Sequence, residues 1–146
     1  MPPFKIQESL GYYLNRCTIL LRARLVERFK DRGIEATAEE WALLALVREH
    51  RDSPLSVNGL ARLSLKDRTT VTRFLDRLEA RRLLVRRPSP VDQRTALIQS
   101  TPEGAPLTEK MAEEAEALMS LLRTDIPKED LEATLRTLKR IMEKLS

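Results

Sequence analysis

Cysteine and histidine are almost absent from this chain of 146 residues, and their scarcity excludes several kinds of site. The one cysteine, Cys17, can form no intrachain disulfide and belongs to no CxxC zinc or redox motif. The one histidine, His50, leaves too few ligands for a histidine-based metal site and too few groups for a catalytic triad. We therefore expect no metal and no cofactor.

Long apolar runs are missing as well. The longest notable run, residues 41–47, has seven residues, whereas a membrane-spanning helix needs about 20. No basic segment followed by an apolar one opens the chain, and no glycine-rich phosphate loop or nucleophile elbow occurs along it. The sequence therefore predicts a cytoplasmic protein that binds no membrane and is not an enzyme.

Positive charge, in contrast, is concentrated in one segment. The formal net charge of the chain is only +4, but residues 62–94 carry ten basic and four acidic side chains, a local surplus of +6. A focused positive field on a small domain is typical of a protein that binds a polyanion.

The spacing of apolar residues predicts helices in the first third of the chain. Steps of three and four predict one amphipathic helix over residues 4–30, with Cys17 on its apolar stripe, where we expect a buried and inert thiol. Thr37 and Glu40 have the spacing of a capping box, which opens a second helix that ends near Arg51.

The segment that follows has the pattern of a helix-turn-helix. Ser56 caps a short helix, residues 64–66 turn the chain, and Asp67 caps a second helix that ends near Arg81. The inner face of this second helix is apolar, at Val71, Phe74, Leu75 and Leu78. Its other face is polar at every position.

A β-hairpin is predicted directly after the helix-turn-helix. Residues 83–87 and 95–101 have strand chemistry, and a polar, proline-broken segment over residues 88–94 connects them. The expected fold class is therefore mainly α with a small β-hairpin wing (α+β). It consists of a winged helix-turn-helix lobe with long N- and C-terminal helices.

Two long helices are predicted at the C-terminal end. Thr101 and Pro102 open one that ends near Thr124, and Pro127 restarts another. Both have apolar stripes, as does the helix over residues 4–30. One compact lobe has no evident need for three such stripes, which favours their burial against a second copy of the chain.

The order of these elements resembles that of the MarR (multiple antibiotic resistance regulator) family of winged helix-turn-helix transcriptional regulators, over essentially the whole chain. The residues that carry the resemblance are Thr37-Ala-Glu-Glu-Trp41, Leu60-Ala61, Asp67-Arg-Thr-Thr-Val-Thr-Arg-Phe-Leu-Asp-Arg-Leu78, Asp92-Gln-Arg94 and Thr101-Pro-Glu-Gly104. The resemblance implies one MarR-like domain over residues 1–146, in which residues 1–35 and 103–146 are dimerisation helices. Residues 36–102 are then the DNA-binding lobe of a homodimer on a pseudopalindromic operator. Repression rather than activation is likewise an expectation from the family.

The candidate DNA contacts lie on the second helix of the helix-turn-helix and on the wing: Lys66, Arg68, Thr69, Thr70, Thr72, Arg73, Arg77, Arg86, Arg87 and Arg94. Arg73 and Arg77 suit guanine or phosphate, and the three threonines suit phosphate or the thymine methyl group. Lys66 and Arg68, at the helix start, are expected to meet phosphates. Arg86 and Arg87 flank the wing and are expected to add sequence-independent affinity.

Two further expectations come from the resemblance. Arg94 is similar to the wing arginine that reaches the minor groove in the family, and Asp92 would brace it. Arg82 stands where the family usually has glycine after the recognition helix, so the turn either costs about 1 kcal/mol or takes another geometry.

A small ligand and a different kind of partner stay open. Family members often lose DNA affinity when a small phenolic or lipophilic anion binds, and Tyr12, Tyr13, Arg16 and Trp41 could line a pocket for a phenolic or carboxylate ligand. Core packing explains these aromatic residues equally well. The alternative to a DNA-binding regulator is a winged-helix dimerisation or adaptor protein that binds another protein. Steep salt dependence of duplex binding would separate the two.

Overall fold

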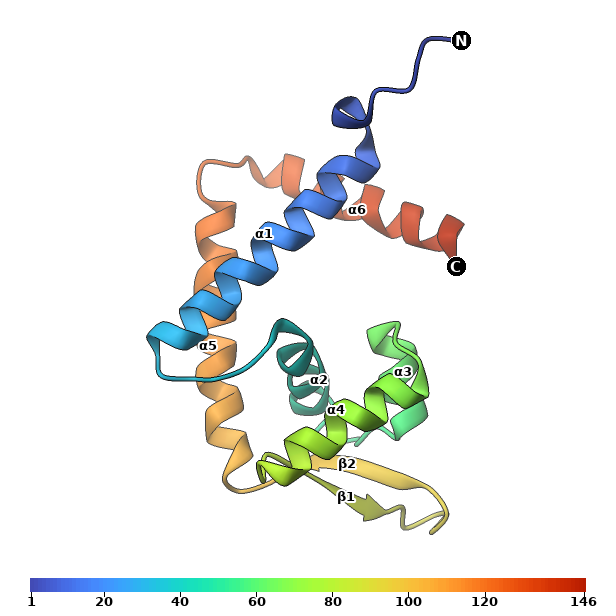
Figure 1. Cartoon of the computed structure of the whole chain (residues 1–146), viewed down its shortest axis with the longest axis vertical. Helices are drawn as coiled ribbons and strands as arrows, with labels where there is room; N and C mark the ends of the chain where they lie inside the picture. The colour runs from blue at the N-terminus through green and yellow to red at the C-terminus, as the bar shows by residue number, and fades with distance from the viewer. The chain divides into compact units, whose positions relative to one another are not determined.

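The computed structural model describes residues 1–146 and is mainly helical with one two-stranded sheet. Two compact units make up the chain, Met1–Glu114 and Ala115–Ser146. The elements, labelled in Figure 1, are the 3-10 helix η1 (Ile6–Glu8), α1 (Leu10–Asp31), α2 (Ala38–Glu49), α3 (Val57–Ser64), α4 (Arg68–Ala80), β1 (Leu84–Pro88), β2 (Ala96–Ser100), α5 (Gly104–Arg123) and α6 (Lys128–Leu145). No helix is long and apolar enough to cross a membrane.

A winged helix-turn-helix forms the core of the first unit, which confirms the predicted fold class. The fully buried side chains of the lobe come from α2, α3, α4 and β2: Leu43, Leu44, Leu60, Val71, Leu75, Leu78 and Ile98. Strands β1 and β2 are antiparallel, with Leu84 opposite Ser100 and Pro88 opposite Ala96. Figure 1 shows the hairpin next to α4, on the side of the lobe opposite α1.

The N-terminal helix is shorter than the predicted span of residues 4–30. A 3-10 turn occupies Ile6–Glu8, and α1 begins only at Leu10. Ser9 separates the two elements because its hydroxyl accepts the N–H of Tyr12 at 3.2 Å and so caps α1. The apolar periodicity continues through this break, which is why periodicity alone did not reveal it.

Only the C-terminal half of the α1 apolar stripe is covered within the chain. Leu25 and Phe29 are buried, whereas Leu10 and Leu20 are 56% and 60% exposed. The expectation that Cys17 is buried is wrong for the single chain, because its thiol lies on the uncovered half and is exposed. In the second unit, α6 likewise exposes Leu135, Met142 and Leu145.

The start of α5 follows the predicted cap with a local irregularity. The Thr101 hydroxyl accepts the Gly104 N–H at 2.9 Å, and the Thr101 carbonyl accepts the Ala105 N–H at 3.0 Å. Pro106 has no N–H for the Pro102 carbonyl, so the regular helix begins at Gly104 instead of Pro102. The capping role of Thr101 is confirmed.

The end of α4 keeps the left-handed turn that glycine normally occupies. Arg82 has φ of 59°, its N–H donates to the Glu79 carbonyl, and the Leu83 N–H donates to the Leu78 carbonyl. This is the Schellman arrangement, in which a β-carbon at the left-handed position is unfavourable.

Arg82→Gly should therefore raise the free energy of unfolding by about 0.5–1 kcal/mol. This gain is the energetic cost of the left-handed backbone at arginine, reduced by the larger conformational entropy of glycine in the unfolded chain. Urea denaturation at fixed protein concentration measures the change. Arg82→Ala is the matched control, since it removes the guanidinium and retains the β-carbon. An equal gain in both variants would show that the backbone turn is not the cause.

Candidate nucleic-acid interface

The turn between α3 and α4 fixes the start of α4, the second helix of the helix-turn-helix and the expected recognition helix. Leu65 is left-handed with φ of 54°, and Asp67 then caps α4 by accepting the Thr70 N–H at 2.8 Å. The Thr70 hydroxyl also donates to Asp67, at 2.8 Å. These two hydrogen bonds from Thr70 hold the pKa of Asp67 below its usual value. The ionised cap contributes its full stability above the unfolded pKa of Asp67. This contribution to stability is lost as the pH falls through the lower folded pKa.

The two faces of α4 differ as the sequence predicts. Val71, Leu75 and Leu78 are buried in the lobe. The candidate contacts on the other face are accessible: Arg68, Thr69, Arg73 and Arg77 are exposed, and Thr70 and Thr72 are half-buried. Thr70 uses its hydroxyl proton in the cap, so toward DNA it offers acceptor capacity and its methyl group.

Phe74 is half-buried at the edge of α4, although the sequence placed it on the inner face. The Lys66 Nζ lies 5.9 Å from the centroid of the Phe74 ring, and the Arg77 guanidinium carbon lies 5.6 Å from it. At these distances the ring attracts both cations. Phe74 therefore gathers two candidate contact residues at the exposed edge of the helix.

Most cations of this surface have no acidic partner. Among the ten basic residues of 62–94, Arg81 pairs with Glu40 and Arg86 pairs with Asp76 and Glu79. Arg68 donates to the amide oxygen of Asn58 at 3.1 Å, which ties α4 to α3. The unpaired guanidinium groups of Arg73, Arg77, Arg87 and Arg94 are exposed.

The wing tip is ordered by short polar side chains. The Asp92 carboxylate accepts the backbone N–H of Arg94 at 3.0 Å, and the Thr95 N–H donates to the Asp92 carbonyl at 2.9 Å. Ser89 closes the other side of the loop, with its N–H donating to the Thr95 carbonyl at 2.8 Å. Asp92 thus braces the backbone at Arg94, while the Arg94 guanidinium extends free into solvent.

The two arginines of β1 have different surroundings. Arg87 is exposed, whereas Arg86 is half-buried and contacts α4 through Asp76 and Glu79. The sequence assigned both to the same role. Neighbouring side chains of a strand point to opposite faces of the sheet. This alternation is the sequence signal that could have distinguished the surroundings of Arg86 from those of Arg87.

The four candidate ligand-pocket residues do not come together within the chain. The Arg16 guanidinium lies 5.4 Å from the centroid of the Tyr12 ring, and the rings of Tyr12 and Tyr13 meet edge to face at 5.5 Å. Trp41 instead packs on Phe29, with ring centroids 5.9 Å apart. Phe29 lies roughly 20 Å further along α1 than Arg16.

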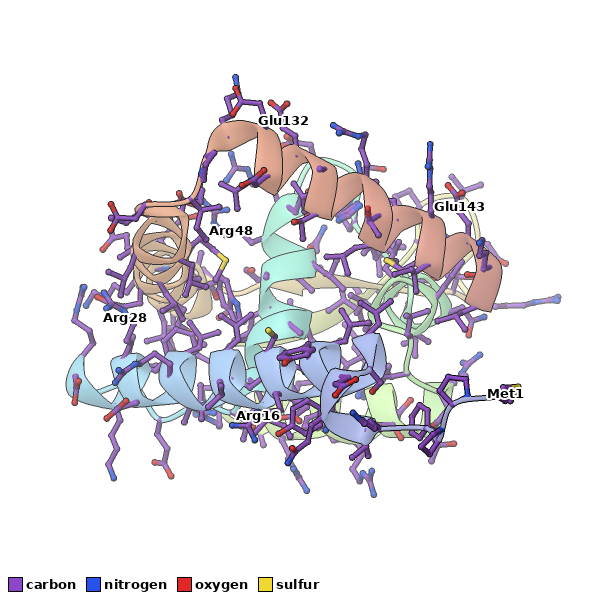
Figure 2. The ribbon with its side chains drawn as sticks, turned by 90° about the horizontal axis from the view of Figure 1, so that it is seen from above. Met1, Arg16, Arg28, Arg48, Glu132 and Glu143 are labelled. Atoms are coloured by element: carbon purple, nitrogen blue, oxygen red, sulfur yellow. The ribbon has the colours of Figure 1, made fainter.

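Sequence reasoning missed the ion pairs that hold the first part of α5. Arg28 donates to the Glu114 carboxylate at 3.0 Å, and Arg48 makes two hydrogen bonds to Glu109, at 2.7 and 3.0 Å. Figure 2 labels these two arginines on α1 and α2. The partners are more than 60 residues apart in the sequence, so no local pattern indicates the pairing. No group of three or more histidine, cysteine or acidic residues is arranged to hold a metal.

Comparisons with known proteins agree with this arrangement. Residues 32–95, which span the helix-turn-helix and most of the wing, match the family model described as MarR family. The match covers 64 of the 146 residues, so the helix-turn-helix segment of this chain is similar to the MarR family. The matched segment contains α4 and β1, the two elements that carry most of the candidate DNA contacts.

Individual relatives extend the likeness to the whole chain. The HTH-type transcriptional repressor NicR of Pseudomonas putida is 27% identical over 109 residues, which cover 75% of this chain and 66% of that repressor. BpsR of Bordetella bronchiseptica, whose DNA binding is regulated by 6-hydroxynicotinic acid, is 25% identical with a TM-score of 0.82 and covers 96% of this chain and 97% of its own. MepR of Staphylococcus aureus, in a complex with DNA, has a TM-score of 0.87 at 19% identity. The match covers 96% of this chain and 99% of MepR. At that identity MepR supports the fold alone.

Proposed function

We propose that this protein is a MarR-type regulator: a homodimer that binds double-stranded DNA sequence-specifically and represses transcription. The observation that carries the proposal is the surface of one lobe on which α4 and the wing present unpaired, exposed arginines. Backbone phosphates supply most of the affinity for such a surface, and groove contacts supply the sequence preference.

The homodimer is supported by apolar surface that the single chain leaves uncovered. The first half of α1 exposes Leu10 and Leu20, and α6 exposes Leu135 and Met142. These residues belong to the segments 1–35 and 103–146, for which we propose the dimerisation role. A two-fold dimer would place two recognition helices about 34 Å apart, in successive major grooves.

Each part of the lobe is given a distinct role. Arg73 and Arg77 enter the major groove with Thr69 and Thr72, while Lys66 and Arg68 bind phosphates at the start of α4. Arg94 enters the minor groove, which attracts a guanidinium most strongly where it is narrow and A·T-rich. Arg87 adds affinity from the wing without reading sequence.

Binding to the DNA beside its own gene tests the function. Fluorescence anisotropy should show much tighter binding to a fragment from the upstream region than to a shuffled duplex of equal length. A footprint of two half-sites about one helical turn apart should accompany it. Equal affinity for both fragments, or no duplex binding, would contradict the proposal and favour the adaptor function.

A small aromatic carboxylate or phenol is the proposed effector. Tyr12 and Tyr13 provide aromatic surface, and Arg16 provides a cation beside them. BpsR is regulated by an aromatic carboxylic acid, 6-hydroxynicotinic acid. Titration of hydroxylated benzoic and nicotinic acids into the DNA complex should release DNA for at least one of them, and Arg16→Gln should weaken that response. Release at the same concentration from the Arg16→Gln variant would exclude this site.

A further inference from the structure

The Arg86 side chain connects the wing to the recognition helix. Its Nη2 atom lies 2.6 Å from Asp76 Oδ1 and 3.4 Å from the Thr72 carbonyl, and its Nη1 atom lies 3.3 Å from Glu79 Oε2. The side chain is 29% exposed. Three acceptors on α4 therefore bind one guanidinium from β1.

These contacts lie at the point where the hairpin is held to the lobe. Arg86 pairs in register with Ile98, which is buried and whose N–H donates to the Leu55 carbonyl at 2.9 Å. The far end of the same hairpin contains Arg94. A change in hairpin tilt at Arg86 would therefore be amplified at the Arg94 guanidinium.

We propose that Arg86 is a positioning residue that holds the wing at a fixed angle to α4 by pairing with Asp76 and Glu79, whose combined charge it halves. The inference rests on the proposed DNA-binding function. The carboxylates of Asp76 and Glu79 already pair with this guanidinium, and a phosphate that displaced them would cost charge-assisted hydrogen bonds. Arg86 supports DNA binding indirectly, by setting the spacing between the major-groove helix and the minor-groove arginine.

Hydrogen–deuterium exchange of the full-length protein without DNA tests the contact directly. Arg86→Gln should speed exchange of the β1 and β2 amides about fivefold, because loss of these hydrogen bonds lowers the local opening free energy. Arg87→Gln is the matched control, since it removes the same charge from the next residue, and its exchange should equal that of the wild type. Arg86→Lys retains the charge and should restore part of the protection. Equal exchange in Arg86→Gln and Arg87→Gln would overturn the proposal.

Salt dependence of DNA affinity distinguishes positioning from a direct phosphate contact. The double variant Arg86→Gln/Asp76→Asn has the net charge of the wild type, so charge alone does not alter the slope of log affinity against log salt. We expect affinity about fivefold lower and an unchanged slope, because loosening the wing removes no phosphate contact. A slope reduced by about one per lobe would overturn the positioning role. If the wild type bound no duplex, the proposed function would fail, while the exchange measurement would still decide whether Arg86 holds the wing.

Discussion

Gly104→Ala should destabilise the protein by about 3 kcal/mol, the upper range for forcing extra volume into a packed site. A β-carbon at this position would lie 2.0 Å from the Leu83 carbonyl oxygen and 2.7 Å from the Leu83 carbonyl carbon. The obstacle is backbone at the start of the wing, so no side-chain rotation relieves it. The first turn of α5 would have to move away, and the bond from the Thr101 N–H to the Leu83 carbonyl would break.

Urea denaturation at one protein concentration measures this loss. Gly11→Ala is the control, because Gly11 lies in α1 with no heavy atom within 4 Å of its would-be β-carbon. Alanine favours the helix there, so that variant should be as stable as the wild type or more stable by about 0.5 kcal/mol. A Gly104→Ala midpoint within the error of Gly11→Ala would show that α5 does not approach the wing this closely.

Arg73→Ala and Arg94→Ala should each weaken operator binding by about 1–3 kcal/mol. Both guanidinium groups are exposed, and neither makes a hydrogen bond or ion pair within the chain, so the melting temperature should stay unchanged. The two losses of affinity should depend on operator sequence in different ways. Arg94→Ala should lose most on operators with A·T-rich sequence beneath the wing, where the narrow groove attracts a guanidinium.

The Arg73 variant separates guanine from phosphate as its partner. Loss of a guanine contact relaxes the preference at one base pair, whereas loss of a phosphate contact weakens all sequences alike and lowers the salt slope by about one per lobe. Arg136→Ala, which removes an exposed charge from α6, is the control and should bind like the wild type. Wild-type affinity in both Arg73→Ala and Arg94→Ala would refute the assigned interface.

The sequence predicted most of the fold because local signals and the global arrangement agree. The capping box of Thr37 and Glu40 forms with both hydrogen bonds present, and Ser56 and Asp67 cap α3 and α4 as expected. The helical spacing of apolar residues on α4 identifies the buried Val71, Leu75 and Leu78 correctly, and only Phe74 of the predicted inner face lies at the edge instead. Consistent signals of this kind specify an element without tertiary information.

Contacts between distant residues could not be predicted in the same way. The roles of Arg86 and Gly104 depend on which backbone or carboxylate lies opposite, and that is decided by packing of β1 against α4 and α5. Cys17 was misplaced for a related reason: periodicity identifies an apolar stripe but not whether the same chain covers it. The Ser9 break and the Pro106 irregularity are local, but the first depends on one capping hydrogen bond and the second on one missing N–H, and apolar periodicity reports neither.

The salt dependence of operator affinity tests the central claim most directly. If α4 and the wing bind DNA through unpaired arginines on two lobes, log affinity should fall linearly with log salt, with a slope on the order of −6 to −10. The operator should remain bound more tightly than a shuffled duplex throughout the titration. A slope near zero, or a steep slope with no preference for the operator, would contradict a sequence-specific DNA-binding regulator.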